Sequence, residues 1–113
     1  MSPMPPGLQA GLSGIQRRRN IMASLLVRFA PRSLTVQQYE ESVRRLQEAG
    51  YFPPEGLDYH VCFGNEGSLK VSEIWSSREA FDAFAELLMP ILADVGIEAG
   101  APEFFDIHNV VRQ

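Results

Sequence analysis

LDYHVCFGNEGSLKVSEIWSSREAFDAF, residues 57–84, is the stretch of sequence that decides the fold. Two short runs rich in β-branched and aromatic residues flank the segment NEGS, a pattern typical of a β-hairpin. Ser76 is followed three residues later by Glu79, which predicts a capping box, and apolar residues then recur at helical spacing. The stretch therefore predicts two paired strands, residues 57–64 and 69–75, and then a helix.

The residues before this stretch predict one more strand and one more helix. Residues 23–30 form a short apolar run that ends before Pro31, as a strand would. Thr35 and Gln38 predict a second capping box, and Gly50 stands where a helix favours a left-handed residue. The apolar stripe between these two signals consists of Val36, Tyr39, Val43 and Leu46.

The residues after the stretch complete the topology. Pro90 predicts a kink or break of the second helix near Met89, because proline lacks a backbone donor. Residues 104–111 predict a final strand. The order strand–helix–strand–strand–helix–strand predicts an α+β, ferredoxin-like fold. Its four-stranded antiparallel sheet would have the order 4-1-3-2, with both helices on one face.

Composition limits the domain organisation and the partners. The chain has 113 residues, which predicts one domain over residues 22–113 after a flexible N-terminal tail, residues 1–21. Three arginines of the tail precede a short apolar run, so a targeting segment is the alternative interpretation. Beyond residue 20 the chain has seven basic and fourteen acidic groups, which disfavours nucleic acid as a partner.

Two further classes of protein are disfavoured. No stretch approaches the roughly 20 apolar residues that cross a membrane, so we expect a cytoplasmic protein with no membrane partner. The single cysteine, Cys62, excludes an internal disulfide and a cysteine-based zinc site. We expect it to be an inert buried thiol.

Both faces of the expected sheet are apolar, although two helices can cover only one of them. The face predicted to be free of helices carries Tyr59, Val61, Phe63 and Ile74. Contiguous apolar patches of this size usually mark interfaces. The pattern therefore predicts a homodimer, and a monomer with a large exposed patch is the alternative.

VSEIWSSREAFDAF, residues 71–84, resembles the antibiotic biosynthesis monooxygenase-like group of the dimeric α/β-barrel superfamily. The resemblance extends over about residues 22–112 and implies two sheets that form a barrel. It also implies a cofactor-independent monooxygenase or isomerase that acts on a small aromatic or anionic metabolite. Two positions depart from the group. Ala85 stands about where haem-degrading members have a ligating histidine, and Val71 stands where polyketide-tailoring monooxygenases have an asparagine.

The hairpin register suggests the catalytic residues. With Glu66-Gly67 as the turn, His60 lies opposite Glu73, Cys62 opposite Val71, and Asp58 opposite Trp75. A carboxylate beside a histidine can make the ring a general acid or base near neutral pH. We therefore predict His60 and Glu73 as catalytic residues, and a structural hydrogen bond is the alternative.

Trp75 and Arg28 are the predicted substrate-binding residues. The resemblance implies that Trp75 lines a pocket and that Arg28 faces the same pocket and binds an anion. The alternatives are a core indole and an ion pair between Arg28 and Glu73. We expect a cavity of a few hundred Å³ beside Trp75, with these side chains directed toward the helices. No metal or cofactor is expected, and a non-catalytic binding or interaction module is the alternative function.

Overall fold

The computed structural model describes residues 24–113, and the predicted tail, residues 1–21, lies outside this part of the chain. The elements follow in the predicted order. They are β1 (Leu25–Phe29), α2 (Val36–Glu48), β2 (Leu57–Phe63), β3 (Lys70–Trp75), α3 (Arg78–Val95) and β4 (Glu103–Asp106).

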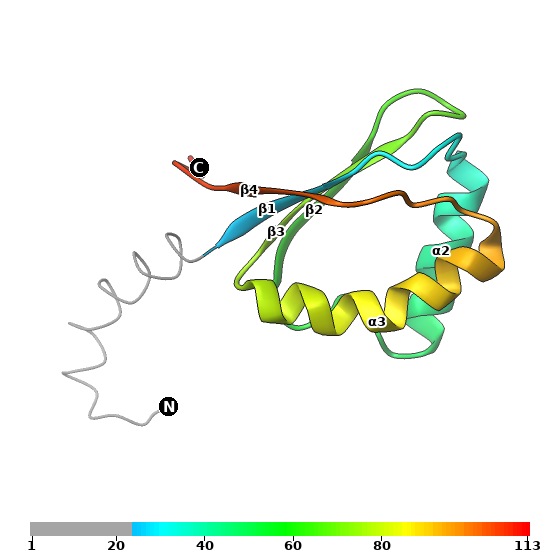
Figure 1. Ribbon diagram of the computed structural model, residues 1–113, viewed down its shortest axis with the longest axis horizontal. Helices are drawn as coiled ribbons and strands as arrows, with labels where there is room; N and C mark the ends of the chain where they lie inside the picture. The colour runs from blue at the N-terminus through cyan, green and yellow to red at the C-terminus, as the bar shows by residue number, and fades with distance from the viewer. Residues whose placement is uncertain (1–23) are drawn as a thin grey trace.

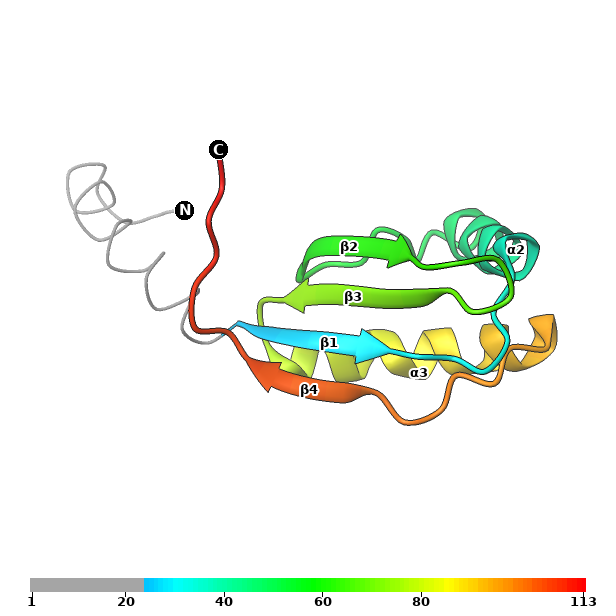
Figure 2. The same ribbon diagram turned by 90° about the horizontal axis from the view of Figure 1, so that it is seen from above.

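The strands form one four-stranded sheet in the order β2-β3-β1-β4, and all three pairings are antiparallel. This is the predicted ferredoxin-like topology. Both helices lie on the same side of the sheet (Figure 1). No helix of the described chain covers the other face (Figure 2). Within residues 24–113 no helix is long and apolar enough to cross a membrane.

The hairpin of β2 and β3 has the predicted register over its outer part. His60 lies opposite Glu73 and Cys62 lies opposite Val71. The predicted pairing of Asp58 with Trp75 is wrong. Leu57 takes that position instead, and the ladder shifts between Leu57 and Tyr59, so Asp58 is the extra residue of a β-bulge.

Helix α2 begins with the predicted capping box. The Thr35 side chain accepts from the Gln38 backbone, and the Gln38 side chain accepts from the Thr35 backbone. The hairpin tip adds a further cap, because Glu66 Oε1 accepts from the backbone N–H of Val36 at 2.8 Å. A carboxylate is favourable at a helix N-terminus. Gly50 follows the helix with φ of 78°, in the predicted left-handed conformation.

Helix α3 differs from the prediction at two places. Its N-cap is Ser77, which accepts from the backbone N–H of Ala80, and not Ser76. The break near Met89 is also wrong, because α3 continues through Pro90 to Val95. Pro90 lies on the exposed side of α3, where water can bond the carbonyl that loses its partner.

Strand β4 is shorter than predicted. It ends at Asp106 instead of Val111. Asp106 already lies opposite Leu25, the first residue of β1. Since β1 is the neighbour of β4 in the sheet, the part of the chain that the structure describes has no strand beside the residues beyond Asp106.

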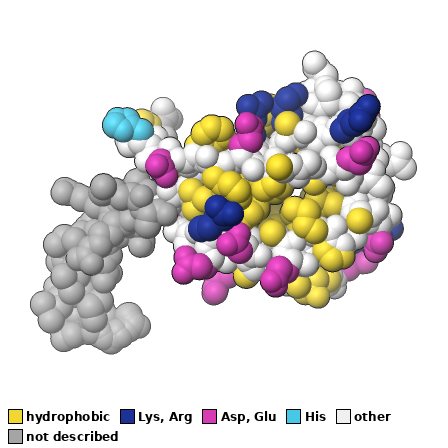
Figure 3. Space-filling model, viewed as in Figure 1, with side chains coloured by type: hydrophobic (Ala, Val, Ile, Leu, Met, Phe, Trp, Pro, Cys, Tyr) yellow, Lys and Arg dark blue, Asp and Glu magenta, His cyan; other side chains and the backbone are white. Residues whose placement is uncertain are grey.

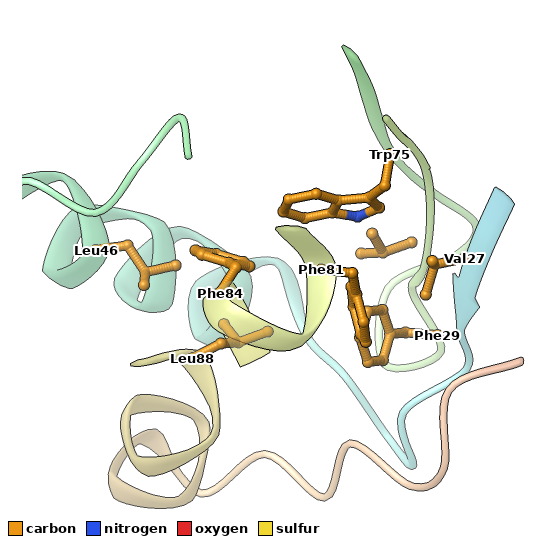
Figure 4. Close-up of a cluster of buried hydrophobic side chains, with 8 residues drawn as sticks. Val27, Phe29, Leu46, Trp75, Phe81, Phe84 and Leu88 are labelled. Carbon is orange, nitrogen blue, oxygen red and sulfur yellow. The ribbon is translucent and has the colours of Figure 1, made fainter. Parts of the chain in front are cut away.

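The main core fills the space between the sheet and the two helices. Its buried side chains are Val27, Phe29, Leu46, Val71, Trp75, Phe81, Phe84 and Leu88. Figure 4 shows Trp75 reaching from β3 toward Phe84 and Phe81 of α3. The indole ring packs against these two rings at centroid distances of 5.5 and 5.6 Å. Its exposed fraction is 0%.

Candidate functional site

A pocket of about 60 Å³ lies between the sheet and the two helices. It is smaller than the few hundred Å³ expected. Apolar side chains gather around a hollow in the same region of the space-filling view (Figure 3). The walls consist of Phe29, Pro31, Leu34, Tyr39, Ser42, Val43, Leu46, Phe52, His60, Val71, Glu73, Phe84, Leu88, Leu92, Ile97 and Ala99.

Four side chains form a continuous hydrogen-bonded chain at one side of this pocket. The Tyr39 hydroxyl lies 2.7 Å from His60 Nε2, and His60 Nδ1 lies 2.6 Å from Glu73 Oε2. The other carboxylate oxygen, Oε1, accepts from Trp75 Nε1–H at 2.9 Å. This series of hydrogen bonds thus extends from helix α2 to the centre of the core.

The fold determines the position of each member. The register of β2 and β3 places His60 opposite Glu73. Glu73 and Trp75 are two residues apart on β3, so both face the helices. Glu73 is only 4% exposed, and a buried carboxylate needs partners. Its two donors, His60 and Trp75, supply them.

The hydrogen-bond pattern assigns the tautomer of His60. A carboxylate only accepts, so Nδ1 carries a proton and donates to Glu73. Nε2 of the neutral ring then accepts from the Tyr39 hydroxyl. Burial, followed by the charges of Cys62 and Glu73, raises the pKa of Tyr39, so this group is a phenol at neutral pH. Nε2 is therefore the atom at which the site can take up a proton.

Aromatic rings enclose the imidazole. Tyr39 stacks against it at a centroid distance of 5.9 Å, and Phe52 meets it edge-on at 5.5 Å. Phe52 also contacts Phe84 of α3, so the rings form a wall from α2 to α3. The side chain of His60 is only 19% exposed. Proton transfer at Nε2 would thus take place largely away from bulk water.

Solved structures with the same fold include named oxygenases. SnoaB, a cofactor-independent oxygenase from Streptomyces nogalater, matches with a TM-score of 0.53 at 14% identity, over 80% of this chain and 96% of that one. A conserved protein from Methanosarcina mazei matches with a TM-score of 0.54 at 16% identity, over 77% and 93%. The chain has the fold of the antibiotic biosynthesis monooxygenase-like proteins.

A third match agrees with this fold. A proposed antibiotic biosynthesis monooxygenase from Chloroflexus aurantiacus has a TM-score of 0.51 at 17% identity, over 79% of this chain and 97% of that one. The sequence itself matches no family profile and no curated protein. Identities this low establish the monooxygenase-like fold alone, so the chemistry depends on the residues of this chain.

Trp75 does not line the pocket of this monooxygenase-like fold. The walls of the pocket include Glu73 but not Trp75, whose side chain is enclosed by Phe81 and Phe84. The alternative of a core indole is therefore the observed one. Trp75 contacts the site indirectly, because its Nε1–H donates to the Glu73 carboxylate, and that carboxylate accepts from His60. Trp75 is a positioning residue for Glu73.

Arg28 lies on the opposite face of the sheet from the pocket. Val27 is the residue opposite Glu73, whereas Arg28 lies opposite Ser72 and Glu103. The predicted position in the pocket on the helix side and the alternative ion pair with Glu73 are both wrong. The reason is parity: neighbours along a strand face opposite sides, and Val27 occupies the helix side. Arg28 Nε is buried and has no hydrogen-bond partner among the described residues.

Sequence reasoning missed Tyr39 and Phe52 as site residues. Tyr39 was read only as a member of the apolar stripe of α2, although a buried tyrosine hydroxyl usually has a partner. That rule was the available signal, but it does not say which residue the partner is. His108 lies beyond β4 and is exposed. In the described chain no three His, Cys, Asp or Glu side chains lie close enough to hold a metal ion.

Cys62 is less buried than expected, and its inertness stays a prediction. It is free and partly buried, and burial raises the pKa of its thiol. A thiol with a raised pKa remains protonated at neutral pH and is a poor nucleophile. The hydrogen-bonded side chains Tyr39, His60 and Glu73 are therefore the candidates for chemistry on this side of the sheet.

Proposed function

We propose that the protein is an enzyme in which His60, held by Glu73, transfers a proton to or from a small molecule bound between the sheet and the helices. The observation that carries the proposal is the position of His60. Nδ1 is held by the buried carboxylate of Glu73, Nε2 lies beside the Tyr39 hydroxyl, and the ring forms part of the wall of a largely apolar pocket. This is the arrangement that general acid–base catalysis requires.

The lining of the pocket favours a neutral, apolar or aromatic substrate. Glu73 is its acidic residue, and neither lysine nor arginine belongs to its walls. Because Arg28 lies on the other face, an anionic substrate would find no lysine or arginine to pair with among the described walls of the pocket. A small aromatic compound therefore fits better than an anionic metabolite.

Proton removal is compatible with both reactions that the resemblance implies. In an isomerase the proton returns at another carbon. In a cofactor-independent oxygenase, the reaction named for SnoaB, removal of a proton makes the substrate electron-rich enough to react with oxygen. The isomerase reaction needs only the groups of this pocket, and we give it preference. A non-catalytic binding module would use the same pocket without proton transfer.

The proposal can be tested by nuclear magnetic resonance of the two histidine rings in the intact chain. We expect phenol, added at millimolar concentration, to shift the ring nitrogens of His60 and to leave those of His108 unchanged. His108 is the internal control because it lies outside the pocket and is exposed. The His108→Asn variant assigns the two signals.

Benzoate supplies the matched ligand. It has the same ring with a negative charge, which the carboxylate of Glu73 would repel. We expect weak or no shift of His60 with benzoate. Equal shifts of both histidines, or no response of His60 to phenol, would contradict a pocket for small neutral molecules.

We further propose that two copies of the chain associate through the helix-free face of the sheet. An apolar row crosses all four strands of this face and consists of Phe105, Leu26, Ile74 and Tyr59. Tyr59 is 50% exposed in the single chain. Contiguous exposed apolar side chains are typical of an interface, and a twofold axis is the commonest way to cover them.

Phe63→Asp tests this association. Phe63 lies on the same face and is 39% exposed, so a lone chain would tolerate the change. In a dimer the substitution would bury an unpaired charge. We expect sedimentation velocity at micromolar concentration to give about 25 kDa, twice the chain mass of 12.6 kDa, for the wild type and the single-chain mass for the variant.

Leu87→Asp is the matched control. Leu87 is 41% exposed but lies on α3, on the other side of the sheet. It should leave the sedimentation of the wild type unchanged. A wild-type protein that sediments only at 12.6 kDa would exclude the dimer.

A further inference from the structure

The Tyr39 hydroxyl is a polar group of the pocket. Proton transfer by His60 alone does not require it. It comes from α2 and lies 2.7 Å from the nitrogen that is proposed to act as the base. Its raised pKa keeps it a phenol, which can donate one hydrogen bond. The apolar pocket therefore presents a donor and a base side by side.

We propose that Tyr39 and His60 together enolise a small carbonyl compound, with Tyr39 donating to the carbonyl oxygen while His60 removes the α-proton. The inference rests on the proposed function, because it needs His60 as the base. It adds a second catalytic residue and the class of substrate.

The spacing of the two groups matches this class of substrate. A carbonyl oxygen and the hydrogen-bearing α-carbon are separated by two bonds, and the oxygen of Tyr39 and Nε2 of His60 are neighbours. In the free protein the two groups satisfy each other. A carbonyl compound that separates them gives the Tyr39 hydroxyl a new acceptor, and it leaves the lone pair of His60 Nε2 directed at the α C–H bond.

The proposed step balances without any further reactant. The α C–H bond breaks and its proton goes to His60 Nε2. The electron pair of that bond forms a carbon–carbon double bond, and the carbonyl electron pair moves to oxygen, which accepts the hydrogen bond of Tyr39. The imidazolium is stabilised by Glu73. Return of the proton to the same carbon gives exchange, and return to a more distant carbon gives an isomer.

The pocket also favours the negative charge that develops on the carbonyl oxygen. The remaining walls are largely apolar, and a hydrogen bond to an oxyanion is worth more where water is excluded. Removal of one such donor from an enzyme typically lowers kcat by about 10²–10³-fold. Loss of the Tyr39 hydroxyl should have an effect of this size.

The experiment follows exchange of the α-protons of cyclopentanone in D₂O by proton magnetic resonance. We expect the wild-type chain to accelerate exchange, Tyr39→Phe to slow it by about 10²-fold or more, and His60→Asn to reduce it to the uncatalysed rate. Asparagine keeps a donor near Glu73 but cannot act as a base. Tyr51→Phe, an exposed tyrosine beyond α2, is the matched control and should exchange like the wild type.

A second measurement separates a catalytic Tyr39 from one that only holds His60 in place. Cyclopentanone and methylenecyclopentane have similar shapes, but only the ketone can accept a hydrogen bond. We expect the wild type to bind the ketone about tenfold more tightly, which corresponds to one buried hydrogen bond. Tyr39→Phe should lose this preference, whereas a purely structural role would weaken both ligands alike. Shifts of the His60 ring report the binding.

The outcomes distinguish the two proposals. Exchange by His60→Asn at the wild-type rate would overturn proton transfer by His60, and the enolisation with it. If His60→Asn is inactive while Tyr39→Phe keeps both the exchange and the ketone preference, only the role of Tyr39 fails. A wild-type chain that does not accelerate exchange overturns the enolisation.

Discussion

Replacement of Trp75 by alanine is expected to bring the protein close to unfolding. The indole is fully buried against Phe81 and Phe84, and loss of such a ring usually costs about 3–5 kcal/mol. The variant also removes the donor to Glu73 Oε1, and a buried acceptor without a partner costs about a further 1–3 kcal/mol. Domains of this kind have a total stability of about 5–15 kcal/mol.

Urea denaturation followed by circular dichroism measures this effect. Trp75→Phe is the intermediate variant, because it keeps one aromatic ring in the core but removes the N–H group and part of the indole. It should cost more than the hydrogen-bond part alone, about 1–3 kcal/mol, and less than Trp75→Ala. Leu87→Ala, at an exposed position of α3, should change the midpoint little. A Trp75→Ala variant no less stable than Leu87→Ala would show that the indole is not a core element.

Glu73→Gln should invert the tautomer of His60. The amide oxygen can still accept from Trp75, but the amide nitrogen then points toward His60 and donates. Nδ1 of His60 must become the acceptor, so the ring proton moves to Nε2 and donates to Tyr39. A base whose lone pair faces the wrong way cannot take a proton from the substrate. We expect proton transfer to fall by about 10⁴-fold, as in enzymes where an equivalent change fixes the wrong tautomer.

The nitrogen resonances of His60 report the tautomer directly, and exchange of cyclopentanone protons reports the activity. Glu79→Gln removes a carboxylate from an exposed position on α3 and should alter neither. If Glu73→Gln keeps the Nδ1–H form and the wild-type rate, the carboxylate does not orient the base.

The central pair of the site could be predicted because a short turn fixes the register of a hairpin. Once Glu66-Gly67 was taken as the turn, His60 had to lie opposite Glu73, and it does. The signals for both helices are equally local, since capping residues act over three positions. In these features, residues that are close in space are also close in the sequence.

The errors concern features that local sequence does not determine. Residues on both faces of β1 are apolar, so alternation could not say whether Val27 or Arg28 faces the helices. The packing of Val27 under α3 decides it. The bond between Tyr39 and His60 joins residues 21 positions apart, and it depends on how α2 lies across the sheet. The pocket volume depends on side-chain packing from every element.

Because of the bulge at Asp58, the loop before β2 can change in length without a change in the position of His60. Leu57 and Tyr59 already lie opposite the consecutive residues Trp75 and Ile74, so deletion of Asp58 would leave a regular ladder in which every later pair is kept. The segment between α2 and β2 can therefore gain or lose a residue here without moving the base away from its carboxylate. Insertions and deletions at this position would therefore be nearly neutral to the proposed chemistry, and lineages that differ in loop length could inherit the same pair of His60 and Glu73.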